Sequence, residues 1–124
     1  MPVRSSSSSV LIWPDHIEVS KAVHVWVVEA ARQHPELLRA GYFGSYARGD
    51  WGVGSDLDLV VIVEKAPERF ERRPLYWDLS RFPVPAELLV YTEDEWQRLQ
   101  AKGGRFARMM AREAIWVYPK GENE

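Results

Sequence analysis

Two aspartates, Asp56 and Asp58, stand one residue apart just before the apolar run from Leu59 to Val63. In a β-strand successive side chains point to opposite faces, so both carboxylates share one face, with their Cα atoms roughly 6.5 Å apart. Two carboxylates this close repel each other unless a cation lies between them. Because the apolar run is typical of a buried strand, the pair is predicted at the start of that strand. This arrangement indicates the binding of a divalent metal ion.

The segment before the aspartates predicts a helix, a strand and a turn. Residues 17–34 place apolar side chains at three- and four-residue spacing, the pattern of an amphipathic helix that ends before Pro35. A strand is expected over Leu37–Phe43, after which Gly44 breaks the chain into a turn. Ser45 is expected to cap the short helix that follows.

The segment from the aspartates onward predicts further strands and helices. Proline is favoured at the first helical position, so Pro74 is expected to open a short helix. Thr92, followed three residues later by Glu95, predicts a capping box at the start of another helix. The elements expected are a strand over Leu57–Val63, the helix from Pro74, a strand over Leu88–Tyr91, the helix from Thr92 to about Ala101, a helical segment with Phe106, Met109 and Met110, and a strand over Ile115–Tyr118.

Length and composition limit the class of protein. The chain has 124 residues, 46% hydrophobic and 27% charged, which predicts one globular domain over residues 15–120 after a flexible segment over residues 1–14. The net charge of -2 argues against a duplex-DNA partner, because such proteins need an excess of basic residues. Cysteine is absent, which excludes a disulfide framework and a thiolate zinc site.

The N-terminal segment and the histidines carry no competing signal. The serine run Ser5–Ser9 is followed by only four apolar residues before Pro14, too few for a signal peptide or a membrane span. A cytoplasmic protein without a membrane partner is therefore expected. His16, His24 and His34 match no metal-binding spacing, and we expect them at helix surfaces or boundaries.

Three other glycine- or aspartate-rich motifs do not fit the segment. A P-loop needs Gly-Lys followed by Ser or Thr, which occurs nowhere in the chain. A Rossmann fingerprint needs a third glycine, and residues 52–57 end instead in leucine and lead into a strand. An EF-hand loop needs other residues where Val60 and Val61 stand. A plain polar turn remains an alternative, although aspartate is depleted in strands.

At these residues the chain resembles the DNA-polymerase-β-like nucleotidyltransferase superfamily. The superfamily pattern is Gly-Ser, three residues, Gly, five residues, then Ser-Asp-x-Asp-Leu. The matching positions are Gly44, Ser45, Gly49, Ser55, Asp56, Asp58 and Leu59. The resemblance covers roughly residues 37–92 and is strongest to the minimal nucleotidyltransferases, small proteins often encoded beside a helical partner of the HEPN class. It implies an α/β (α+β) fold, with a small mixed sheet flanked by helices.

The resemblance implies where a nucleoside triphosphate and its metal ions bind. Gly44 lacks a Cβ, which lets a triphosphate approach the backbone, and Ser45 adds a hydroxyl donor at a helix N-terminus. Asp56 and Asp58 would share Mg²⁺ in a two-metal displacement at the α-phosphorus. Ser55 belongs to the same nucleotide-binding motif.

Members of the superfamily usually carry a third acidic residue, most often aspartate, on the next core strand. The matching segment is Ala86–Thr92, so Glu87 is the candidate third catalytic and metal-binding residue. Glutamate is one methylene longer than aspartate, and a shift of about 1 Å can remove productive geometry from such a site. The alternative is a solvated residue at a sheet edge.

Several other residues have two open interpretations. Arg48 either contacts a phosphate of the nucleotide or ends its short helix. Trp51 either stacks on a base or covers its own loop. Arg69, Arg72 and Arg73 indicate a solvated charged segment, with substrate binding as the alternative. Trp26, Trp116 and the pair Met109 and Met110 are expected in the core.

The leading functional hypothesis is a metal-dependent nucleotidyltransferase that transfers AMP from ATP, or the monophosphate of another nucleoside triphosphate, to a hydroxyl group. The resemblance implies that the acceptor lies on a HEPN toxin, with this chain as its antitoxin. The partner could also be a second copy of the chain. Two alternatives remain: a weakly active or inactive binding module that neutralises a helical partner, and a transferase that modifies small molecules such as antibiotics.

Overall fold

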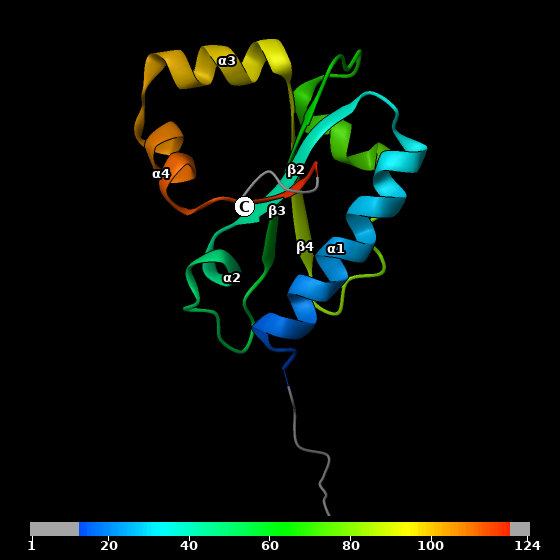
Figure 1. The fold of residues 1–124 in the computed structure, drawn as a ribbon, viewed down its shortest axis with the longest axis vertical. Coiled ribbons are helices and arrows are strands. Elements are labelled where there is room, and N and C mark those ends of the chain that lie inside the picture. The colour runs from blue at the N-terminus through cyan, green and yellow to red at the C-terminus, as the bar shows by residue number, and fades with distance from the viewer. Residues whose placement is uncertain (1–12, 120–124) are drawn as a thin grey trace, which may run out of the picture.

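A computed structural model describes residues 13–119 of the chain. Within these residues a mixed four-stranded sheet of order β4-β3-β2-β5 lies between helices (Figure 1), which confirms the expected α/β class. The predicted flexible segment falls largely on residues 1–12, outside the described residues. The elements are α1 (His16–Gln33), β2 (Leu37–Phe43), α2 (Ser45–Arg48), β3 (Leu57–Val63), the 3-10 helix η1 (Phe70–Tyr76), β4 (Ala86–Thr92), α3 (Glu93–Lys102), α4 (Arg105–Glu113) and β5 (Ile115–Tyr118).

The predicted amphipathic helix is α1, which covers one face of the sheet. Its first turn is capped by Asp15, whose carboxylate accepts the Glu18 N–H at 2.9 Å. Apolar side chains at helical spacing form its buried face and meet alternate residues of β3. This core includes Val19, Val23, Trp26, Val27 and Ala30 of α1 and Leu57, Leu59, Val61 and Val63 of β3.

The other face of the sheet packs against α3 and α4, which lie on the opposite side of the strands from α1 in Figure 1. Val60 and Ile62 of β3 point to this side because side chains alternate along a strand. They form a second core with Trp96 and Met110. Met109 and Trp116 pack against this core, as expected from the sequence.

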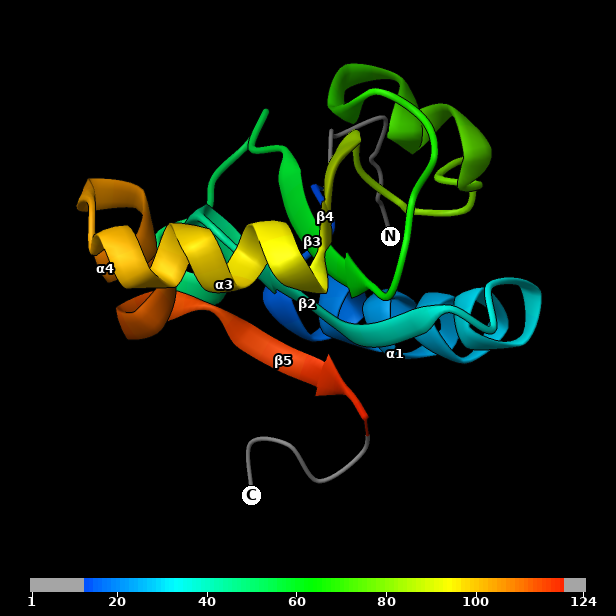
Figure 2. The same ribbon diagram turned by 90° about the horizontal axis from the view of Figure 1, so that it is seen from above.

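The pairing of the strands fixes which site residues become neighbours. Strand β2 is antiparallel to both β3 and β5, whereas β3 and β4 are parallel. Asp58 pairs with Phe43 on one side and with Glu87 on the other. Seen from above (Figure 2), β5 and η1 lie at opposite edges of the sheet. The motif residues therefore gather where β2 ends and β3 and β4 begin.

Most predicted elements are confirmed, with β4 extending further than the expected Leu88–Tyr91. The capping box is present, since Thr92 Oγ1 accepts the Glu95 N–H and a Glu95 carboxylate oxygen accepts the Thr92 N–H. The cap of α2 was predicted wrongly, because Gly44 is the N-cap and no side chain caps that helix.

The region before β4 also differs from its prediction. The helix expected to start at Pro74 is instead η1, which begins four residues earlier and contains Pro74. The expectation that Arg73 is solvated was wrong as well, since its side chain is only 8% exposed. Its guanidinium donates two hydrogen bonds to Glu95 and one to the Val90 carbonyl, which draws η1 against β4.

Candidate active site

Gly44 connects β2 to α2 and lies directly against Asp58. Its φ of +79° is in the region that favours glycine. A Cβ built on Gly44 would overlap Asp58 Oδ2, so even alanine does not fit without displacing that carboxylate. The turn that resembles a phosphate-binding motif therefore contacts the aspartate of β3 directly.

Three carboxylates converge on this end of the sheet. Asp58 is half-buried on β3, next to Glu87 of the parallel strand β4. Asp56 is exposed and lies one residue before β3, which begins at Leu57 as predicted, so only Asp58 of the pair lies within the strand. Burial raises the pKa of Asp58, and the negative charges of Glu87 and Asp56 raise it further. The site therefore concentrates negative charge around a partly desolvated carboxylate.

These carboxylates suit a hard divalent cation, because Mg²⁺ prefers oxygen ligands and its charge would offset their mutual repulsion. Within residues 13–119, no three His, Asp or Glu side chains are already arranged to hold a metal ion. Binding there would therefore require side-chain adjustment. The assignment of Asp56, Asp58 and Glu87 as metal ligands stays a prediction.

A fourth carboxylate, Glu113 at the end of α4, contacts the same turn. Its Oε2 accepts the Gly44 N–H at 3.0 Å and Arg48 Nη1 at 3.3 Å. Its side chain is only 12% exposed. A carboxylate oxygen thus already occupies the N–H of Gly44, at the turn where a triphosphate is expected to approach the backbone. The sequence predicted no role for Glu113, since 69 residues separate it from Gly44.

The remaining motif residues divide between the site and its loop. Arg48 faces the site through Glu113 and also donates from Nε to Asp50 at 2.9 Å. Ser55 accepts the Gly52 N–H on its hydroxyl at 2.8 Å, so it braces the loop before the aspartates. Ser45 is the first residue of α2 and is partly buried.

Trp51 covers its own loop in this structure. Its ring stacks on that of Tyr46, with centroids 5.7 Å apart and planes 9° from parallel. Tyr46 is fully buried and accepts the Trp13 indole N–H on its hydroxyl at 2.8 Å. These contacts join the loop before the aspartates to the start of α1.

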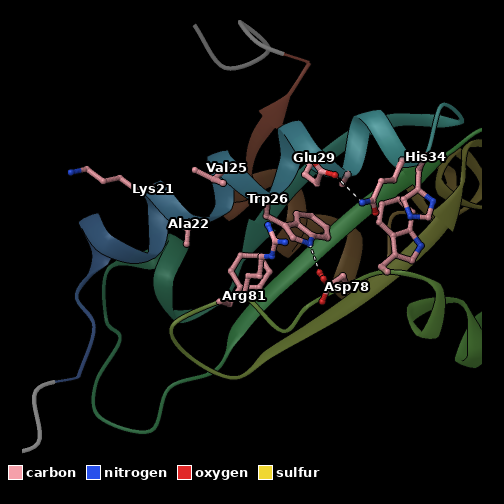
Figure 3. Close-up of a pocket in the computed structure, with 12 residues that line it drawn as sticks. Lys21, Ala22, Val25, Trp26, Glu29, His34, Asp78 and Arg81 are labelled. Carbon is pink, nitrogen blue, oxygen red and sulfur yellow. Dashed lines mark hydrogen bonds between the residues drawn. The ribbon is translucent and has the colours of Figure 1, made fainter.

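A cavity of about 280 Å³ lies apart from these residues, between α1 and the segment before β4 (Figure 3). Trp26 lies at its centre and donates its indole N–H to the Asp78 carbonyl at 2.7 Å. Lys21, Glu29 and Arg81 also line it. No residue of the glycine- and aspartate-rich motif contributes to this cavity, so it is separate from the candidate active site.

Comparison with known proteins identifies the family of the chain. A family model described as "Nucleotidyltransferase domain" matches residues 25–114, nearly three-quarters of the chain and the whole motif. The chain therefore belongs to the nucleotidyltransferase-domain family. The enzyme class expected from the sequence is confirmed at the level of this family.

One curated relative is the "Putative protein adenylyltransferase MJ0141" of Methanocaldococcus jannaschii, which is 34% identical over 55 residues. That match covers 44% of this chain and 56% of the relative, so the chain spans little more than half of the relative's length.

Two solved structures share the fold. A putative nucleotidyltransferase from Sulfolobus solfataricus has a TM-score of 0.59 at 21% identity and covers 86% of each chain. A structure described as a toxin-antitoxin with AMP-PNP has a TM-score of 0.51 at 13% identity, covering 81% of this chain and 76% of the other. At these identities the likeness concerns the fold alone.

No helix within residues 13–119 is long and apolar enough to span a membrane.

Proposed function

We propose that this protein transfers AMP from ATP to a hydroxyl group on a partner protein. The contact between Gly44 and Asp58 carries the proposal, because it brings the expected triphosphate-binding turn against the expected metal-binding carboxylates. The name of the Methanocaldococcus relative supports a protein acceptor and adenylyl transfer. The AMP-PNP in the description of the toxin-antitoxin structure supports an adenine nucleotide as donor.

Each residue has a distinct part in the proposed reaction. The Gly44 N–H and Arg48 bind the triphosphate after Glu113 moves away, with Ser45 as a further donor. Asp56, Asp58 and Glu87 would hold Mg²⁺, whose positive charge would offset the negative charge of the phosphates when it is bound. Ser55 keeps the loop before Asp56 in place.

The transfer exchanges one phosphorus-oxygen bond for another. The acceptor oxygen forms a bond to the α-phosphorus, and the bond from that phosphorus to the bridging oxygen of the β-phosphate breaks. Pyrophosphate leaves with the bonding electrons. The hydroxyl proton passes to a carboxylate of the site, for which Glu87 is the candidate because it is exposed beside Asp58.

The proposed role of this transfer is that of an antitoxin. The toxin-antitoxin description of one structural neighbour supports it. The resemblance stated from the sequence adds a helical HEPN toxin as the expected acceptor. Under this proposal the acceptor hydroxyl belongs to the toxin, and its modification neutralises the toxin.

The test follows label from [α-³²P]ATP with Mg²⁺ to the protein encoded by the neighbouring reading frame. We expect transfer by the unmodified protein and at least a roughly 100-fold loss in both Asp56→Asn and Asp58→Asn. Glu64→Gln is the matched control, because Glu64 is an exposed carboxylate at the opposite end of β3. AMP-PNP binding by calorimetry tests the donor half separately. Transfer that survives both aspartate substitutions would contradict the proposal.

A further inference from the structure

Three arginines form a line on the outer surface of α4. Arg105, Arg108 and Arg112 follow the spacing i, i+3 and i+7, which places them on one helical face over about 10 Å. All three are exposed, whereas Ala107 and Met110 face the core. We call these three residues the arginine stripe.

The positive charge of the arginine stripe is not balanced by neighbouring carboxylates. Within residues 13–119 none of its members forms an ion pair, and Arg108 donates only to the Gly103 carbonyl. Among the other exposed arginines, Arg32 pairs with Glu29, Arg69 with Glu71 and Arg98 with Asp94. Arg72 and Arg81 are exposed as well and form no ion pair within the described residues. Because the chain as a whole carries a net charge of -2, the stripe is a local feature and not a consequence of basic composition.

The arginine stripe ends at the candidate active site. Arg112 is followed by Glu113, whose carboxylate contacts the Gly44 N–H and Arg48. In Figure 1 the end of α4 and the short helix α2 lie on the same side of the molecule. A partner that lies along α4 therefore has one end beside the proposed donor phosphates.

We propose that the arginine stripe binds an acidic surface of the acceptor protein. This proposal rests on the proposed adenylyl transfer. Guanidinium groups pair with carboxylates through two parallel hydrogen bonds, a geometry that lysine does not provide. Three arginines on one helical face match Glu or Asp side chains at the same spacing on a partner helix. Docking there presents a hydroxyl of the partner to the site beside Asp58.

A protein partner fits the charges better than a nucleic acid does. Tight duplex binders contact about 6–10 phosphates, and their affinity depends on a broad basic surface. Here three arginines stand on a chain of net negative charge. Complementary charge over so small an area selects and orients a partner, with most of the affinity supplied by contacts around it.

Binding is tested without nucleotide, by fluorescence anisotropy with a labelled helical peptide of about 20 residues. The peptide carries one tyrosine and glutamates at i, i+3 and i+7, and a second peptide carries lysines in their place. The triple variant Arg105→Gln, Arg108→Gln, Arg112→Gln is compared with a control triple that changes the paired arginines in the same way: Arg32→Gln, Arg69→Gln, Arg98→Gln. We expect the acidic peptide to bind and the stripe variant to lose about tenfold in affinity. The control triple keeps the affinity of the unmodified protein.

Three outcomes overturn the docking proposal: equal loss in the control triple, equal binding of the lysine peptide, or tighter binding of a single-stranded RNA of similar length.

AMP-PNP affinity, measured on the same variants, separates the two proposals. Retained nucleotide binding with lost peptide binding places the effect on the acceptor side. If the unmodified protein binds no AMP-PNP, the proposed function fails, while the peptide result still decides whether the stripe is a docking surface. In the transfer assay, the stripe variant is expected to raise KM for the acidic peptide and leave kcat unchanged.

Discussion

Gly44 is the residue at which backbone conformation and chemistry depend on each other. Gly44→Ala adds a Cβ that meets Asp58 Oδ2, so the carboxylate or the turn must shift. A displacement of about 1 Å can reduce catalysis about 100-fold, and we expect a loss of that order in nucleotide transfer. Gly49→Ala is the matched control, because Gly49 also has a positive φ of 89° but has no atom within 4 Å of its added Cβ. Measurements of transfer rate and circular dichroism distinguish site damage from unfolding, and equal losses in the two variants would contradict this interpretation.

The motif residues could be predicted from the sequence because their spacing is local. Asp56 and Asp58 are two residues apart, and Gly44 belongs to the same short segment. The contact of Glu113 with Gly44 could not be predicted, because it depends on how α4 packs against the sheet. The predicted Ser45 cap was wrong because α2 begins at Ser45, which makes Gly44 the N-cap residue. Glycine has no side chain with which to cap the helix.

Among the elements, η1 and α3 are joined by the ion pair of Arg73 and Glu95. The hydrogen bonds from Arg73 lower the pKa of Glu95 to about 2 from an ordinary value of 4.5. A carboxyl whose pKa is lowered by folding stabilises the fold above its unfolded pKa and loses that contribution as the pH falls toward its folded pKa. The stabilising effect is therefore full above pH 4.5 and disappears between about pH 4.5 and 2.

Glu95→Gln is expected to lower the free energy of unfolding by about 2 kcal/mol at pH 7, a value reduced for solvent screening because the Glu95 side chain is 36% exposed. Asp94→Asn, which breaks an exposed pair on the same helix, is expected to cost less than about 0.5 kcal/mol. Urea denaturation at several pH values measures both. A Glu95→Gln deficit that stays constant down to pH 2.5 would rule out this ionic contribution.

The helices and strands were predictable where the pattern of apolar residues was strong. The apolar run of β3 and the helical spacing of α1 both correspond to faces buried in the structure. Residues 70–76 lacked such a pattern, and their position depends on Arg73 reaching Val90 and Glu95. The preference of proline for the start of a helix is a local property, so it could not predict these long-range hydrogen bonds. The tertiary contacts determined where the helical segment begins.

At the scale of the whole molecule, β5 completes the sheet against β2. Gly41 allows this close approach, since a Cβ there would overlap the Ile115 carbonyl oxygen. We expect Gly41→Ala to lower the free energy of unfolding by about 1–3 kcal/mol, because the strand pairing must shift to accept the methyl group. Gly52→Ala is the control, since no atom lies within 4 Å of its added Cβ. Chemical denaturation measures the two variants, and similar stabilities would show that β5 is not held this tightly.

The contact between Glu113 and Gly44 also has a consequence for the order of events during protein synthesis. The glycine-serine turn and the aspartates leave the ribosome well before α4 and β5, which lie about 45 to 75 residues further along the chain. Until those elements are made, β2 lacks its β5 neighbour and the Gly44 N–H lacks its carboxylate partner. The turn that is expected to bind nucleotide therefore reaches its final surroundings only late in translation, and a partly synthesised chain carries the motif without the complete site.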